Sequence, residues 1–212
     1  MISPADIQVT KVDLTLFSTV LIVSNLVGSQ LQKTALFNDS WKNFALATLL
    51  GVALHGLLTN KISSMINNSL NVDNDGIKQS VYDLIKFGTI FVSQKAITSY
   101  LEGKQIVFDQ KGAMTSGLTI GGYAAFNMIE SFLPRVGTQQ PLYNDLIKVS
   151  MGALAANYFI DGTINKAHLL SLASLLSGFV AFHLATKQMV VPKEKFETLG
   201  GISTMPKTRT NN

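Results

Sequence analysis

The chain has 212 residues, of which 47% are hydrophobic and only 14% are charged, and its mean hydropathy is +0.28. Soluble domains carry roughly 25% charged residues, so this composition excludes an ordinary soluble domain and favours helices packed in lipid. The absence of cysteine excludes disulfides and thiolate metal sites, and the net charge of +4 reports membrane orientation rather than a nucleic-acid partner.

The first two predicted helices are uncharged apolar runs at residues 14–32 and 43–60. A helix rises about 1.5 Å per residue, so runs of this length approach the ~30 Å thickness of the hydrocarbon core. Trp41 precedes the second run, where an indole ring suits the headgroup region. Because the link between the runs is short, they are predicted to be antiparallel neighbours. Residues 1–13 form a polar N-terminal segment ahead of them.

The segment at residues 61–79 is predicted to be a polar connection. Its residues 71–76 resemble the start of a calcium loop, but Tyr82 stands where the bidentate carboxylate is required, so an Asp-Gly turn is favoured. The following run at residues 80–101 contains three charged side chains. It either spans as an interior helix or lies along the interface, and spanning is favoured because the polar and apolar faces are not cleanly separated.

The run at residues 167–186 is the clearest predicted span, with twenty residues and no Asp, Glu, Lys or Arg. Together with runs at 112–129 and 143–161 it gives about six helices. Four of the runs are uncharged, whereas those at 80–101 and 143–161 contain charges and either span or lie at the interface. The predicted fold class is an all-α, polytopic transmembrane helical bundle over residues 14–186.

Two pairs of small residues predict where the helices pack closely. Gly117 and Gly121 stand four residues apart, as do Gly152 and Ala156, so each pair lies on one helical face. Small side chains on one face allow a neighbouring backbone to approach in a membrane bundle. These four residues are the predicted helix-packing positions.

Residues 187–212 form a basic tail that carries two prolines and no apolar periodicity, and we expect it to be flexible. With six spans both termini share one side, and that side collects eleven of the 17 basic residues. The bias places both termini on the cytoplasm-equivalent side of the membrane.

An aspartate that closely follows an aromatic residue and precedes a lysine by three positions occurs three times. The copies are Asp39 with Lys42, Asp83 with Lys86, and Asp145 with Lys148. The spacing is similar to the mitochondrial carrier signature, but the proline of that signature is missing from every copy and the chain is too short, which excludes that family. The first and third copies would enter from opposite faces, as in an inverted repeat. The alternative is that acidic residues near helix starts and lysines at membrane surfaces are simply common.

The chain contains no metalloprotease HExxH, no P-loop and no nucleophile elbow, so we expect no enzyme activity, catalytic residue, cofactor or metal. Four polar residues are candidates for burial between helices: Glu130, Asn127, Asp83 and Lys95. Such groups mark ion pathways when they face a cavity. For Glu130 the alternative is a place at the helix end, in the headgroups.

The chain has an Asn- and Lys-rich stretch at residues 60–78, a tail ending KTRTNN and no cysteine. In these features it resembles the small multi-span, membrane-associated minor capsid proteins of the internal membrane of large icosahedral DNA viruses. That resemblance implies a non-enzymatic structural membrane protein of the virion. It would anchor or scaffold a larger assembly, with the bilayer and other subunits, contacted through polar loops and the basic tail, as its partners.

The alternative function is a small transporter or channel. It requires the inverted repeat to be real and the four candidate buried residues to face a common cavity. A membrane enzyme is a weaker alternative, because the three histidines are scattered and identify no acid or base.

Overall fold

The computed structural model describes residues 4–70, 75–132 and 141–188, and within these ranges the chain is all-α. The six helices are α1 (Pro4–Gln32), α2 (Asp39–Ser69), α3 (Asp75–Leu101), α4 (Gln110–Phe132), α5 (Pro141–Asp161) and α6 (Lys166–Gln188). The predicted helical bundle is therefore confirmed. Most of the tail predicted at residues 187–212 and of the calcium-like stretch lies outside the described residues.

Two helices are longer than their apolar runs. α1 begins at Pro4 rather than at residue 14, so most of the predicted polar segment is helical. Proline suits the first turn of a helix, because the N–H groups of that turn have no acceptor within the helix. α2 continues to Ser69 because Ile62 and Ile66 pack against Tyr82 of α3, which gives its polar second half a buried stripe.

The start of α2 is fixed by local hydrogen bonds. Asn38 caps the helix, and its side-chain oxygen accepts a hydrogen bond of 2.8 Å from the backbone N–H of Trp41. Asp39 in the first turn forms an exposed ion pair of 2.8 Å with Lys42. The first of the three Asp/Lys copies therefore lies at an exposed helix end and forms a surface ion pair.

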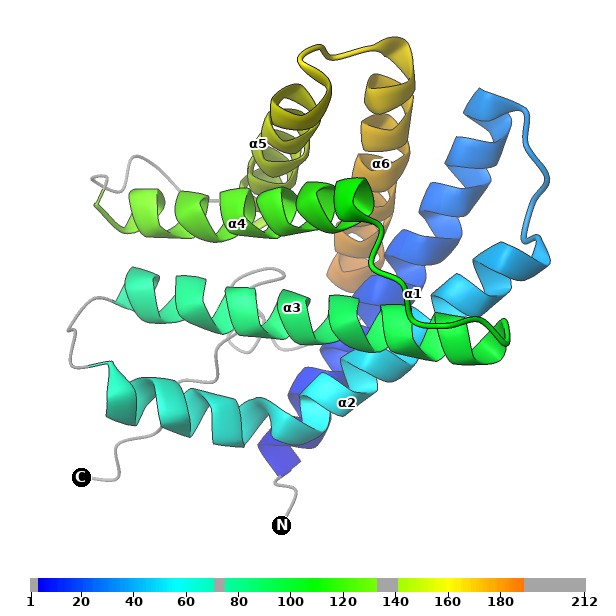
Figure 1. The fold of residues 1–212 in the computed structure, drawn as a ribbon. Helices are drawn as coiled ribbons and strands as arrows, with labels where there is room; N and C mark the ends of the chain where they lie inside the picture. The colour runs from blue at the N-terminus through cyan, green and yellow to red at the C-terminus, as the bar shows by residue number, and fades with distance from the viewer. Residues whose placement is uncertain (1–3, 71–74, 133–140, 189–212) are drawn as a thin grey trace.

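The six helices form a closed ring (Figure 1). Each helix packs against the helices before and after it in the chain, and α1 packs against α6 to close the ring. The links α1–α2, α3–α4 and α5–α6 lie at one end, which we call the loop end. The odd-numbered helices start, and α6 ends, at the opposite terminal end.

The outer surface of the ring is apolar. Leu46, Leu50, Leu54 and Leu57 form an exposed stripe along α2, and exposed large hydrophobic residues occur on every helix. Among the residues that the structure describes, three helices are long and apolar enough to cross a membrane: residues 10–32 of α1, 39–69 of α2 and 166–185 of α6. The uncharged run at residues 112–129, in α4, is not among them.

The structure corrects part of the predicted helix-packing positions, because the close approach of α4 and α5 involves a different glycine of α4. A Cβ on Gly152 of α5 would lie 2.7 Å from the carbonyl oxygen of Thr119, and Ala156 is fully buried, so this pair lies on the α4 seam. Gly117 and Gly121 of α4 face open space instead. Gly122 makes the approach, with its Cβ position 2.9 Å from the Cα of Gly152. One residue is about 100° around a helix, so the neighbouring glycine lies on a different face.

Candidate functional site

Buried charges gather inside the ring toward its terminal end. Asp13, Asp83, Lys86, Asp145, Lys148 and His183, which we call the charged layer, are each less than one-tenth exposed. They lie near the N-terminal ends of α1, α3 and α5 and near the C-terminal end of α6. Because these ends share one side of the bundle, residues far apart in the sequence lie at one level.

The first ion pair of the charged layer crosses the ring. Lys86 Nζ of α3 lies 2.7 Å from Asp13 Oδ1 of α1, although α1 and α3 are not neighbours in the ring. Lys86 is fully buried, and its ammonium lies 6.0 Å from the centre of the Phe87 ring. The second carboxylate oxygen of Asp13 is buried and has no hydrogen-bond partner among the described residues. This carboxylate therefore retains an unused acceptor in the bundle interior.

The second pair joins α5 and α6. His183 Nε2 lies 2.9 Å from Asp145 Oδ2. An ionised carboxylate only accepts hydrogen bonds, so Nε2 carries the hydrogen and donates it. Lys148, one turn after Asp145, places its ammonium 5.9 Å from the centre of the Tyr123 ring of α4. The ammonium group of Lys148 on α5 thus faces an aromatic ring of α4.

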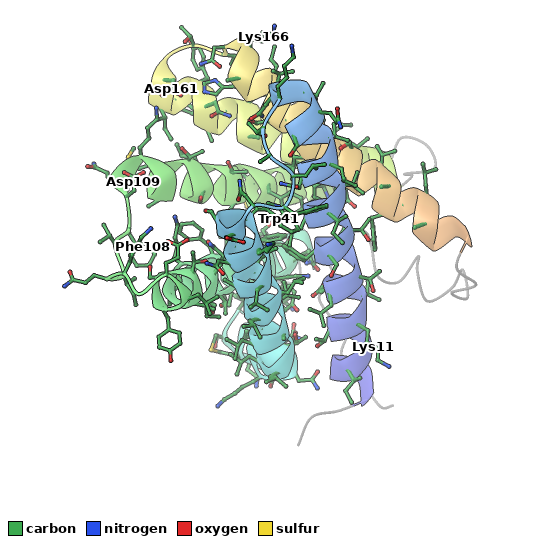
Figure 2. The ribbon with its side chains drawn as sticks, turned by 90° about the vertical axis from the view of Figure 1, so that its right-hand side faces the viewer. Lys11, Trp41, Phe108, Asp109, Asp161 and Lys166 are labelled. Carbon is green, nitrogen blue, oxygen red and sulfur yellow. The ribbon has the colours of Figure 1, made fainter. Side chains whose placement is uncertain are left out.

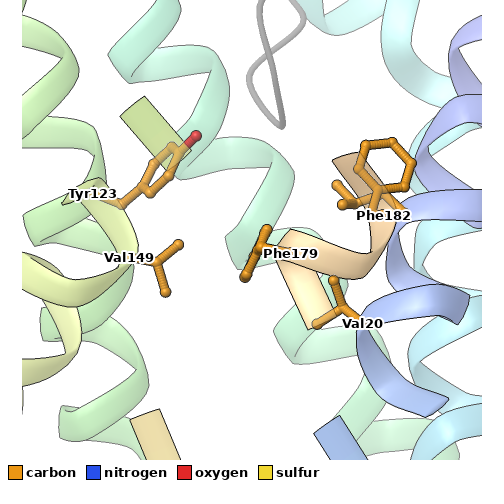
Figure 3. Packing of buried hydrophobic residues seen from close by; sticks show 6 residues of the cluster. Val20, Tyr123, Val149, Phe179 and Phe182 are labelled. Atoms are coloured by element: carbon orange, nitrogen blue, oxygen red, sulfur yellow. The ribbon is translucent and has the colours of Figure 1, made fainter. Parts of the chain in front are cut away.

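Apolar side chains of α1, α4, α5 and α6 pack together in a buried cluster (Figure 3). The cluster comprises Leu16, Val20, Tyr123, Val149, Phe179 and Phe182. Phe87 packs against it, with its ring 5.4 Å from that of Tyr123. Such packing excludes water, which lowers the local dielectric constant and strengthens the attraction within each ion pair.

A smaller polar contact links α2 and α3. His55 Nε2 lies 3.2 Å from the hydroxyl of Tyr82, and both side chains are fully buried. His55 Nδ1 has no hydrogen-bond partner in the part of the chain that the structure describes. This contact holds α2 and α3 together beside the charged layer.

The loop end carries a third, exposed polar cluster. Asp161 at the end of α5 contacts Lys111 of α4 at 2.6 Å and His168 of α6 at 3.0 Å. The hydrogen bond from Lys111, assisted by the charges of Lys111 and protonated His168, holds the pKa of Asp161 below its ordinary value of 3.8. Asp161 therefore ties the ends of three helices together. Figure 2 shows Asp161 and Lys166 on the same side of the molecule, far from Lys11.

Of the two candidate polar residues whose side chains the structure describes, Asp83 lies in the charged layer and Lys95 does not. Asp83 is fully buried and accepts a hydrogen bond of 3.0 Å from Gln79. Lys95 is partly exposed on α3, nearer the loop end. The side chains of Asn127 and Glu130 lie outside the described residues.

Sequence reasoning did not predict the burial of the other five members of the charged layer, although a signal was present. The tetrapeptide Asp-Leu-Ile-Lys occurs twice, at residues 83–86 of α3 and 145–148 of α5. The third aspartate of the layer is Asp13, also followed by leucine, rather than the exposed Asp39. The charges on these helices mark the bundle interior, not the membrane surface.

No known protein family, curated protein or solved structure matches the chain. Within the described ranges, no group of three histidine or acidic residues lies close enough to hold a metal ion. The geometry of the charged layer is therefore the basis for any functional proposal.

Proposed function

We propose that the chain is a multi-span integral membrane protein that transports a small ion or charged solute through its ring of helices. The charged layer is the main observation that supports this proposal. Burying an ion in an apolar interior costs several kcal/mol even when it is paired, so ionisable residues between membrane helices usually belong to transport pathways. A bundle serving only as an anchor needs no such groups.

The exposed aromatic residues at the loop end support a membrane-spanning ring. Tyr100, Phe108, Tyr158 and Phe159 are exposed at this end, and Trp41 lies at the start of α2 (Figure 2). Tyrosine and tryptophan gather where the hydrocarbon meets the headgroups. In this orientation the charged layer lies toward the side where α1 begins and α6 ends, which the distribution of basic residues assigns to the cytoplasm or its equivalent.

The test is flux through the purified full chain in phosphatidylcholine–phosphatidylglycerol liposomes, with H⁺, K⁺ and Cl⁻ as separate probes. We expect at least one probe to cross faster than in empty vesicles. Asp13→Asn and Lys86→Ala should return this flux to the empty-vesicle level, because each removes the ion pair that crosses the ring.

The exposed Asp39–Lys42 pair provides the matched control. It has the same residue types at close distance, but outside the ring interior, so Asp39→Asn and Lys42→Ala should retain wild-type flux. Lys95→Ala should also retain it. Flux equal to empty vesicles for every probe, or equal losses in the control variants, would contradict a transport role for the charged layer.

The second candidate is the anchoring role, which the resemblance to viral internal-membrane proteins implies. Its support is the loop between α3 and α4, where Ile106, Val107 and Phe108 are all exposed. A contiguous exposed apolar segment suits contact with another subunit. Under this candidate, gentle detergent extraction recovers the chain in a stoichiometric large assembly, and replacing the three residues by serine releases it. A transporter would be recovered as a small oligomer or monomer.

A further inference from the structure

Three glycines on the outer side of the neighbouring helices α3 and α4 have no packing contact within the chain. A Cβ built on Gly88 of α3, or on Gly117 or Gly121 of α4, would meet no atom within 4 Å. The other helical glycines whose surroundings the structure describes all meet another group, most of them across a helix seam. Glycine inside a helix costs about 0.5–1 kcal/mol relative to alanine. These three positions therefore carry that cost without a contact in the single chain.

The outer side of α3 and α4, which we call the glycine face, differs from the leucine stripe on α2. Leucine side chains suit contact with lipid tails, whereas small residues in membrane helices mark places where another helix approaches closely. Among the described residues, neither α3 nor α4 contains a segment long and apolar enough to cross a membrane. The glycine face therefore favours contact with other helices over contact with lipid alone.

One hydrogen bond sets the relative level of residues on the two helices. α3 and α4 lie side by side and run in opposite directions (Figure 1). The hydroxyl of Ser80 on α3 donates a buried hydrogen bond of 2.7 Å to the carbonyl oxygen of Ala124 on α4. Counted along both helices from this bond toward the loop end, Gly88 lies level with Gly117 to within one residue, a rise of about 1.5 Å.

The glycine face has projecting leucines and a groove at matching levels. The groove is shallow and apolar, and it is lined by Leu84, Ile85, Gly88, Thr89, Val92 and Ser93 of α3. Leu118 of α4 is exposed and, by the same count, lies level with the groove. Leu84 is also exposed and lies level with Gly121. Each helix therefore projects a leucine at a level where the other helix has a glycine.

The charges at the loop end of the glycine face are complementary as well. Lys95 lies two helical turns after Gly88, on the same side of α3. Asp109 caps α4, and its Oδ2 accepts a hydrogen bond of 2.8 Å from the backbone N–H of Gly112. Lys95 and Asp109 are equally far along the chain from the hydrogen bond that links α3 and α4, so they lie at one level. Neither forms an ion pair within the described part of its own chain.

We propose that the glycine face binds a second copy of this chain, with α3 of each copy packed against α4 of the other. A two-fold axis parallel to these helices leaves every level unchanged and gives both copies the same orientation in the membrane. Leu118 of one copy then enters the groove beside Gly88 of the other, Leu84 lies over Gly121, and Lys95 faces Asp109. This inference is independent of transport, because each ring encloses its own charged layer.

Disulfide cross-linking tests this arrangement, since the chain has no cysteine and introduced thiols are the only ones present. Full-length Leu84→Cys and Gly121→Cys chains are purified separately, mixed, reconstituted in phosphatidylcholine–phosphatidylglycerol liposomes with a large excess of lipid, and oxidised. We expect a disulfide-linked dimer in the mixture and much less with either chain alone, because the symmetry brings position 84 of one copy to position 121 of the other. Leu54→Cys, on the leucine stripe of α2, mixed with Gly121→Cys is the matched control and measures random collisions.

A second variant fills the groove without disturbing the single chain. Gly88→Leu, added to both cross-linking chains, should reduce the cross-link to the level of the Leu54→Cys control, because the new side chain occupies the place of Leu118 from the other copy. It should not lower the melting temperature in detergent, which covers the glycine face and therefore reports the single chain. Ala173→Leu adds a similar side chain to an exposed position of α6 and should leave the cross-link unchanged.

A charge exchange tests the ends of the interface. Lys95→Glu places two carboxylates together and should weaken the cross-link, whereas Lys95→Glu combined with Asp109→Lys restores opposite charges and should recover it. Cross-linking in the mixture equal to the Leu54→Cys control overturns the dimer, and lipid or another protein then covers the glycine face. Equal effects of Gly88→Leu and Ala173→Leu on the cross-link also overturn it.

Discussion

At the scale of single residues, the ion pair between Lys86 and Asp13 carries a large desolvation cost, because both charges are removed from solvent. Both side chains are buried, and their atoms are 2.7 Å apart. Lys86→Ala leaves the Asp13 carboxylate charged and unpaired, so we expect a loss of about 3 kcal/mol or more in the free energy of unfolding. The measurement is denaturant unfolding in a mild detergent, followed by circular dichroism.

The exposed pair of Asp39 and Lys42 provides the comparison, because it has the same charges without the burial. Lys42→Ala should cost less than about 1 kcal/mol, as is typical of surface ion pairs. The double variant Asp13→Leu with Lys86→Met should recover much of the stability, since apolar residues of similar size often replace a buried pair without loss. If Lys86→Ala and Lys42→Ala had equal effects, the Lys86 pair would not be buried as described.

Asp161 gives a prediction about pH. Its pKa lies below 3.8 in the folded protein, because Lys111 and His168 stabilise the carboxylate. The folded chain therefore binds this proton less readily than the unfolded chain, and the stabilisation is complete above pH 3.8 and is lost as the pH falls through the lowered folded value. The difference in melting temperature between wild type and Asp161→Asn should be largest well above pH 3.8 and disappear in stronger acid. A difference that persists there unchanged would contradict the assignment.

At the scale of helices, the seam between α4 and α5 depends on a close approach of two backbones. A methyl group at Gly152 would lie 2.7 Å from the Thr119 carbonyl oxygen, so Gly152→Ala must push the helices apart and should cost about 1–3 kcal/mol. Gly117→Ala is the control, because its Cβ meets nothing and alanine favours a helix by about 0.5–1 kcal/mol. Melting temperatures in detergent should move in opposite directions, and a shared direction would place the seam elsewhere.

The sequence predicts the helices better than their ends and faces. Apolar runs show that helices exist, because each run has to be covered by lipid or by a neighbour. The extension of α1 to Pro4 and of α2 to Ser69 could not be read from these runs, since the added turns are stabilised by distant partners such as Lys86 and Tyr82. The packing face of α4 was missed because Gly121 and Gly122 are adjacent, and only the position of α5 decides between them.

At the scale of the whole molecule, the charged layer exists only because the ring closes. Asp13 and Lys86 are 73 positions apart in the chain, and no local pattern indicates that they meet. The equal spacing of Asp and Lys was visible in the sequence, but the exposed Asp39 was grouped with the buried copies, because burial is a property of the assembled ring. The repeated Asp-Leu on α1, α3 and α5 becomes interpretable once these helices are seen to start at one end.

The six described helices form three helical hairpins, α1–α2, α3–α4 and α5–α6, and this arrangement makes a prediction that a collection of unrelated ion pairs would not make. Lys86 of α3 reaches back across the ring to Asp13 of the preceding hairpin. By the same step around the ring, a lysine at position 16 of α1 should reach Asp145 of α5, the position now served by His183. His183→Leu alone removes the contact with Asp145 and should lower the melting temperature in detergent, whereas adding Leu16→Lys should restore much of it.

Leu16→Lys in the presence of His183 is the control, since it adds a buried positive charge without removing one and should destabilise the ring. If the double variant were no more stable than His183→Leu, the three hairpins would not be equivalent, and the pairing of Asp145 with His183 would be a local contact between α5 and α6.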